Sequence, residues 1–149
     1  MTLRTVEFDI SDVAPKTTHH SKKIITVNGH GSMADTPKLR TAKRFWREAL
    51  KPHIPNTPFL APVRLSVALV WPFRASDPKR VSEAGVLVPC TAKPDLTNIT
   101  KTIEDILVEL GFIENDQGNS SLIVNKYWGS DPYIYVCLEE MDSLMRGRK

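Results

Sequence analysis

One ten-residue segment constrains the fold of this chain more than any other: PVRLSVALVW, residues 62–71. Every second residue from Val63 to Trp71 is apolar, and Ala68 and Val70 add apolar side chains on the opposite side of the extended chain. A strand that is apolar on both faces is typical of the interior of a sheet. We therefore predict a sheet with this segment as a central strand.

Four other segments show strand patterns. Residues 4–10 alternate, with Val6, Phe8 and Ile10 on one side, and residues 85–91 are consistent with a short strand. Residues 121–128 and 132–140 also alternate, and the turn sequence GSDP joins them. The last two segments are therefore predicted to form an antiparallel hairpin.

Two segments show helical spacing. Asp35 and Thr36 offer a cap before Pro37 at a first helical position, and apolar residues then recur at helical intervals through Leu50. A second apolar stripe begins at Leu96 and ends at Gly111, a typical C-terminal cap. The opposite face of this second helix gathers Thr97, Asn98, Lys101 and Asp105. These residues are expected to face solvent or a ligand.

The order of these elements predicts an α+β protein with a mixed, mostly antiparallel sheet and two main helices. A length of 149 residues fits a single compact domain. We assign residues 1–142 to this domain and residues 143–149 to a basic C-terminal tail. Residues 12–23 and 72–85 lack periodicity and are predicted to be basic loops.

Charge is unevenly distributed along the chain. Residues 1–93 carry 15 Lys and Arg against 7 Asp and Glu, a balance of +8, whereas residues 94–149 carry 5 against 10, a balance of −5. A basic half beside an acidic half suggests a polyanion-binding surface next to a cation site, although solvated surfaces also show such bias.

Several protein classes are excluded by what the sequence lacks. It contains no P-loop, no Gly-rich dinucleotide motif, no His-Glu-x-x-His and no internal repeat. Cys90 and Cys137 form neither a disulfide framework nor a zinc ligand pair. The longest apolar run, Val67–Trp71, is too short to span a membrane, and the first ten residues do not resemble a signal peptide. We expect a soluble, cytoplasmic protein.

The second helix has a carboxylate before its start and another after its end. If the strand after Asp116 pairs beside the helix N-terminus, Asp95 and Asp116 could converge, and two carboxylates with substrate phosphate and water suffice for Mg²⁺. Lys101 could then steady a phosphate. The same residues also suit structural roles: Asp95 as an N-cap, Asp116 in a turn, and Lys101 with Asp105 as an i,i+4 pair.

The string KPDLTNITK, followed by a helix, an Asn-Asp pair and then LIVNKYW, resembles the signature of the RusA-type Holliday junction resolvases. That signature is KPD-hydrophobe-DN, then Lys, then an Asp-Asp turn before a strand, and the close match runs from Thr91 to Tyr127. The resemblance implies a small homodimeric α+β endonuclease, of a type often carried by phages and prophages. Such enzymes use Mg²⁺ and acidic residues to cut four-way DNA junctions symmetrically in recombination and repair.

The resemblance also implies roles for individual residues. Asp95, Lys101 and Asp116 match the catalytic residues, the two aspartates being metal ligands, and Asn98 matches the motif asparagine. Two positions depart from the signature: Thr97 replaces its second aspartate, and Asn115 replaces the first aspartate of the turn. A hydroxyl cannot supply the charge of a carboxylate, so activity could be weakened or lost. The possible substitutes are Glu114 and Asp105.

Three functions remain open at this point. The first is a homodimeric Mg²⁺-dependent resolvase that grips DNA through basic residues and cuts at the acidic site. The second is a catalytically impaired protein of the same fold that binds branched DNA. The third is a protein-interaction domain without a DNA role. The basic residues expected to contact DNA are Lys16, Lys22, Lys23, Lys43, Arg47, Lys79, Arg80 and Lys93.

Overall fold

The computed structural model describes residues 2–18, 21–144 and 147, and the fold is described for these residues. In chain order the elements are β1 (Thr5–Ile10), β2 (Lys22–Val27), β3 (His30–Asp35), α1 (Pro37–Leu50), η1 (Lys51–His53), β4 (Val63–Pro72), α2 (Lys79–Ser82), β5 (Val88–Pro89), α3 (Leu96–Glu109), η2 (Asp116–Gly118), β6 (Asn119–Gly129) and β7 (Tyr133–Glu140). The main sheet has the order β1-β7-β4-β6-β5, and β2 and β3 form a separate two-stranded sheet. The α+β class is confirmed, with a single compact domain.

Strand β4 lies between β7 and β6, which confirms its predicted central position. It runs antiparallel to β7 and parallel to β6, and the other pairings of the main sheet are antiparallel. The mixed, mostly antiparallel sheet is therefore confirmed as well.

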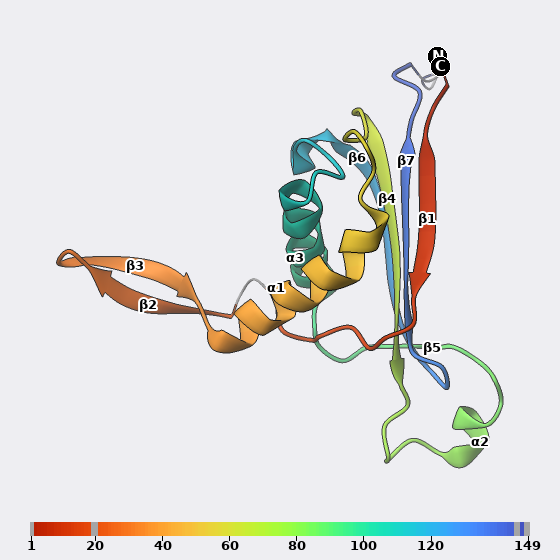
Figure 1. Cartoon of the computed structure of the whole chain (residues 1–149). Helices are drawn as coiled ribbons and strands as arrows, with labels where there is room; N and C mark the ends of the chain where they lie inside the picture. The colour runs from red at the N-terminus through yellow and green to blue at the C-terminus, as the bar shows by residue number, and fades with distance from the viewer. Residues whose placement is uncertain (1, 19–20, 145–146, 148–149) are drawn as a thin grey trace.

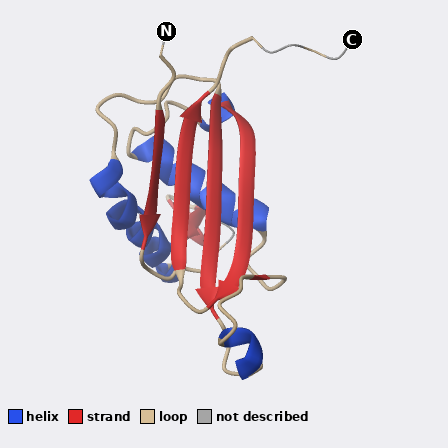
Figure 2. Cartoon of the chain, turned by 90° about the vertical axis from the view of Figure 1, so that its right-hand side faces the viewer, coloured by secondary structure: helices blue, strands red, loops and turns tan. Residues whose placement is uncertain are grey.

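Helices α1 and α3 cover one face of this sheet, and no described helix covers the opposite, bare face (Figures 1 and 2). The core fills the space between the helices and the sheet, where Leu65 and Leu69 of β4 meet Trp46 of α1 and Ile103 of α3, all fully buried. Burying such side chains stabilises the fold by roughly 1.5–3 kcal/mol each. This packing holds α3, which carries most of the candidate site, against the sheet.

Both helices begin and end as the sequence predicted. Thr36 caps α1 by accepting a hydrogen bond from the backbone N–H of Leu39 at 3.2 Å, and Pro37 opens the helix. Helix α3 is followed by Gly111 with φ 84°, a conformation that glycine adopts without steric cost.

The predicted hairpin of residues 121–140 is wrong, because β4 lies between β6 and β7. The chain crosses the end of β4 at residues 130–132. The crossing is tight: a Cβ on Gly129 would lie 2.7 Å from Cγ1 of Val70 and 2.9 Å from Cδ2 of Leu87. The physical reason is burial, since the most apolar strand loses more water-exposed surface between two neighbours than at an edge.

The predicted basic loop at residues 12–23 is wrong at its end, where Lys22 and Lys23 begin a hairpin that the prediction missed. Residues 19–20 of that loop lie outside the described part of the chain. The turn consists of Asn28 and Gly29 with φ 50° and 79°, and Asn-Gly is a strong hairpin signal. In Figure 1 this hairpin projects away from the body of the protein as an arm.

Three smaller differences concern local structure. The predicted loop at residues 72–85 contains the single helical turn α2, and the strand predicted at residues 85–91 shortens to Val88–Pro89. Most of the predicted tail, residues 143–149, lies outside the described residues. Within the described residues, no helix is long and apolar enough to cross a membrane.

Candidate active site

Asp95 occupies the N-cap position of α3, as predicted, but its side chain makes no capping hydrogen bond. Nδ2 of Asn98 donates a long, weak hydrogen bond to Oδ2 of Asp95 at 3.5 Å. Asp95 is exposed. Its carboxylate is therefore accessible to a ligand and is not consumed by helix capping.

Lys126 fixes the loop that presents Asp95, and the sequence prediction missed this residue. Its Nζ donates to the backbone oxygens of Ala92 at 2.5 Å and Pro94 at 2.9 Å. In β6 it is aligned with the fully buried Leu69, so it points to the helix side of the sheet. In the predicted strand, Lys126 occupies a position where the alternating pattern places apolar residues that face the core. A lysine at such a position requires polar partners, so the sequence pattern could have identified Lys126.

Lys101 connects two carboxylates from different parts of the chain. Its Nζ lies 2.6 Å from Oδ2 of Asp116 in η2 and 3.0 Å from Oδ1 of Asp105 on its own helix. The hydrogen bonds to Asp116 and then Asp105 raise the pKa of Lys101 above its ordinary range, and the bond from Lys101 lowers the pKa of Asp116. All three side chains are 35–43% exposed. Lys101 and Asp116 are therefore charged at neutral pH, and the group is partly open to a substrate.

A second link runs beside the first, between Glu104 of α3 and Asn119 at the start of β6. Nδ2 of Asn119 donates to Oε2 of Glu104 at 2.6 Å, and burial raises the pKa of this glutamate. The Lys101–Asp116 link and the Glu104–Asn119 link each join residues that are 15 positions apart in the sequence. The second link begins three residues after the first on α3 and ends three residues after it at Asn119. Together they hold the turn that contains Asp116 against the middle of α3.

The predicted convergence of Asp95 and Asp116 required β6 to begin beside the N-terminus of α3, but Asp116 is tied to the middle of the helix. Lys101 is six residues from Asp95, an axial rise of about 9 Å. Six residues are also about one and two-thirds helical turns, so Asp95 and Lys101 lie on different sides of α3. The structure therefore ties Asp116 to Lys101 and does not show it in contact with Asp95.

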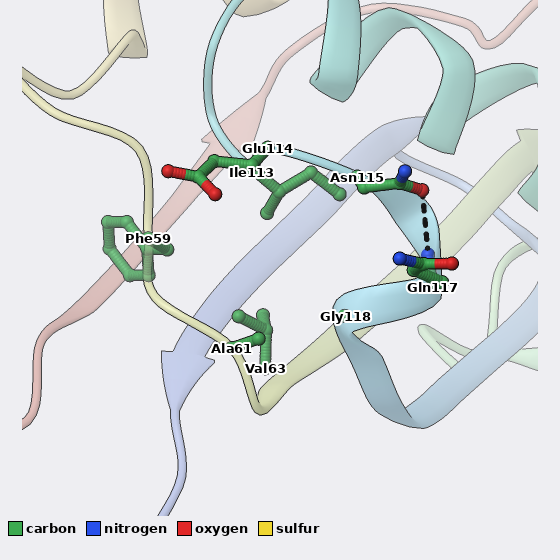
Figure 3. Close-up of a pocket in the computed structure, with 8 residues that line it drawn as sticks. All are labelled: Phe59, Ala61, Val63, Ile113, Glu114, Asn115, Gln117 and Gly118. Carbon is green, nitrogen blue, oxygen red and sulfur yellow. Dashed lines mark hydrogen bonds between the residues drawn. The ribbon is translucent and has the colours of Figure 1, made fainter.

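The residues that replace motif aspartates have different environments. Thr97 is exposed in the first turn of α3. Asn115 has a structural role, because its side chain caps η2 by accepting from the N–H of Gln117 at 3.1 Å. Glu114 extends toward Phe59, away from Asn115, at a small pocket of about 150 Å³ that none of Asp95, Lys101 and Asp116 lines (Figure 3). Of the two possible substitutes, Asp105 contacts Lys101 and Glu114 lies apart from it.

The donor set fits Mg²⁺ better than a metal that needs a full protein cage. Within the described residues, no group of three or more His, Cys, Asp or Glu is placed to hold a metal. Mg²⁺ is usually bound through one or two carboxylates, with water and substrate phosphate completing its shell. Asp95 and Asp116 are the two carboxylates that the sequence predicted for such a site, and the hydrogen bond from Lys101 lowers the pKa of Asp116, so this carboxylate is ionised at neutral pH.

Three of the eight residues predicted to bind DNA form ion pairs within the protein. Lys22 and Lys43 both bind Asp35, at 2.9 Å and 2.7 Å, and Arg47 binds Glu109 at 2.5 Å. Among the described residues, Lys16, Lys23, Lys79, Arg80 and Lys93 form no ion pair, and all five are exposed.

A cluster of two cations, Lys16 and Arg74, lies over Trp128, and Arg74, which also pairs with Asp77 at 3.0 Å, was not predicted. Nζ of Lys16 lies 5.0 Å from the centre of the Trp128 ring and 5.7 Å from that of Trp71, while Cζ of Arg74 lies 4.7 Å from the centre of Trp128. Stacking on aromatic rings holds both cations in place. Trp128 lies two residues after Lys126, so the cluster adjoins the strand that fixes the Asp95 loop.

The bare face of the sheet has the opposite charge. Glu7, Asp9 and Glu139 share it, and Arg64 is the basic residue aligned with Glu139 in the neighbouring strand. Like charges would repel a polyanion from this face. DNA is therefore expected on the side of the helices.

One comparison with known proteins finds a match. The family model for the endodeoxyribonuclease RusA matches residues 12–139 of the 149-residue chain. A search of curated proteins finds no match. The matched region contains all three predicted catalytic residues and the whole of α3. The chain therefore belongs to the RusA endodeoxyribonuclease family, whose activity is the nucleolytic resolution of Holliday junctions.

Proposed function

We propose that this protein is a Mg²⁺-dependent endonuclease that resolves four-way DNA junctions as a homodimer. The observation that carries the proposal is a partly exposed group: Lys101 of α3 lies between Asp105 of the same helix and Asp116 of η2, and Asp95, whose carboxylate makes no capping hydrogen bond, stands at the start of α3. An exposed lysine flanked by ionised carboxylates suits the scissile phosphate and its metal.

Lys101 acts as a cation in this mechanism. Because Asp116 and Asp105 raise its pKa, it keeps its proton at neutral pH and does not serve as a general base. Its amine instead donates hydrogen bonds to the oxygens of the phosphate, where negative charge accumulates during cleavage. For this the amine exchanges one of its carboxylate partners for the phosphate.

Asp95 and Asp116 would hold the metal, and each is positioned by a neighbour. Lys126 fixes the backbone before Asp95, and the Glu104–Asn119 link supports the turn of Asp116. A divalent cation bound there would neutralise charge on the scissile phosphate. Two copies of the site, related by a two-fold axis, would match the two equivalent strands of a junction.

The assay that tests the proposal compares a synthetic four-way junction with linear duplex of the same sequence, each with and without Mg²⁺. We expect symmetric, religatable nicks in the junction that require Mg²⁺, and little cleavage of the duplex. Equal cleavage of both substrates would contradict junction specificity. Junction binding without cleavage at any Mg²⁺ concentration would favour the impaired binding protein.

The alternative function, an impaired protein that binds branched DNA, is supported by Thr97, which stands where the motif has an aspartate. Replacing it with aspartate should raise the single-turnover rate of junction cleavage at limiting Mg²⁺ by about tenfold, because the side chain is exposed beside Asp95 and would add metal-binding charge. Folding should not suffer, since negative charge in the first helical turn is favourable by about 0.3–1 kcal/mol. A Mg²⁺ titration of the parent, Thr97→Asp and Thr97→Asn checks this. Equal rates for all three would show that the missing aspartate is not limiting.

Lys126→Met should lower cleavage about 10- to 100-fold and shift the Mg²⁺ requirement upward, with junction affinity close to that of the parent. Methionine keeps the apolar stem but leaves the oxygens of Ala92 and Pro94 without their donor, so the Asp95 loop moves, and a shift of about 1 Å can cost 10²-fold in rate.

The Mg²⁺ midpoint of cleavage separates this positioning role from simple destabilisation. Lys126→Arg should restore part of the activity, since a cationic donor remains. The control is Lys51→Met, which removes an exposed lysine at the end of α1. A Lys126→Met protein with the Mg²⁺ midpoint and rate of the parent would exclude the role.

A further inference from the structure

The arm formed by β2 and β3 exposes apolar side chains on both of its faces. Ile24 and Met33 are partners across the two strands and are 78% and 61% exposed. Ile25 and Val27 point to the other face and are also exposed. An isolated two-stranded hairpin is marginally stable in water at best. Within the described part of the chain, nothing covers these apolar side chains of the arm.

The base of the arm is held firmly, in contrast to the rest of it. Oγ of Ser21 lies 2.6 Å from Oγ1 of Thr36. The carboxylate of Asp35 binds Lys22 of β2 and also Lys43 of α1. These links orient the arm relative to α1, and beyond them it projects from the body (Figure 1). A fixed base with an exposed apolar extension is suited to reaching another molecule.

We propose that the arm is the dimerisation element of the protein, and that a second copy of this chain covers it. The inference deepens the proposed function, because it names the surface that pairs two junction-cutting subunits. In a two-fold interface each arm would pack on the other subunit, so every arm contact occurs twice. The arm contains 14 residues, Lys22–Asp35. Together with the surface on which the partner's arm would dock, each subunit would approach the about 20–30 residues per side that a stable interface uses.

Charge distinguishes a protein partner from DNA. Residues 24–34 contain no Lys, Arg, Asp or Glu. DNA-binding segments use Lys and Arg for phosphate contacts, whereas the buried centre of a protein interface is depleted of charge. The composition therefore fits a second subunit.

The test is sedimentation velocity of the full-length protein from about 1 to 100 μM, without DNA or metal. The variant Ile24→Glu/Met33→Glu places charge on one face of the arm. Both side chains are exposed in the single chain, so circular dichroism and the melting of the monomer should be unaffected. The matched control, Leu60→Glu/Val86→Glu, changes two exposed apolar residues outside the arm by the same charge.

We expect the parent and the control to be dimers and the arm variant to dissociate at least about tenfold more readily, since each substitution acts twice in a two-fold interface. Amide hydrogen exchange over residues 22–35 should be slow in the parent and fast in the variant. A variant that dimerises as tightly as the control, or a parent that is monomeric throughout, would overturn the proposal. An unchanged dimer with weakened junction binding would assign the arm to DNA instead.

This measurement is independent of catalysis. A protein that dimerises through the arm but never cuts junctions would sustain the arm and contradict the nuclease. A protein that cuts junctions while the arm variant stays dimeric would support the nuclease and contradict the dimerisation role of the arm.

Discussion

Asp95→Asn and Asp116→Asn are each expected to lower Mg²⁺-dependent junction cleavage by about 10²-fold or more, while junction binding stays intact or becomes tighter. Residues that merely orient metal ligands often cost 10- to 100-fold when replaced, and a lost ligand should cost at least as much. Binding should not weaken, because an amide removes negative charge close to the DNA phosphates.

Neither substitution should unfold the protein. Asparagine is as good an N-cap as aspartate, and Asp95 makes no capping hydrogen bond that could be lost. The Lys101–Asp116 pair is partly exposed, and such pairs typically contribute about 0–1 kcal/mol. A loss of cleavage with unchanged melting can therefore be attributed to chemistry.

The measurement is single-turnover cleavage of a labelled four-way junction, with affinity determined in parallel in EDTA. Asp131→Asn is the matched control, since Asp131 is an exposed aspartate in the connection between β6 and β7. If both site variants cut like this control, the acidic site is elsewhere. Asp105→Asn, measured beside them, shows whether the second carboxylate on Lys101 substitutes for the missing motif aspartate.

Junction affinity should survive removal of the metal and fall by about 10³-fold or more between 50 and 200 mM salt. The five exposed basic residues without an ion pair, counted in two subunits, would neutralise about ten phosphates, and 6–10 such contacts give losses of about 10³–10⁵ over this range. Lys22, Lys43 and Arg47 should contribute less, because Asp35 and Glu109 already neutralise them.

A titration of fluorescent junction at several salt concentrations in EDTA gives this slope. Lys79→Ala/Arg80→Ala should reduce the slope by about 4, because two phosphate contacts are lost in each of the two subunits, and Lys22→Ala should change it less. A salt-independent affinity would remove the premise that the basic surface binds DNA, and would return the protein-interaction alternative to consideration.

Local features of the chain were readable from sequence because their physical causes are local. Apolar residues on both faces of residues 62–71 demanded a central strand, and Thr36, Pro37 and Gly111 marked helix ends through backbone preferences of single residues. The family signature around Asp95 could be found for the same reason, because it lies within one continuous segment. The Asn28–Gly29 turn was equally local, and its signal was overlooked.

Pairings between distant segments were decided by the tertiary structure. The insertion of β4 between β6 and β7 reflects competition among strands for buried positions, which adjacency in sequence does not reveal. The placement of Asp116 on Lys101, the capture of Lys22, Lys43 and Arg47 by acidic partners, and the reach of Lys126 to the Asp95 loop all join residues brought together by packing. Sequence determined which chemical groups the protein possesses, and only the folded chain determined which of them are neutralised, which are oriented and which remain open to DNA.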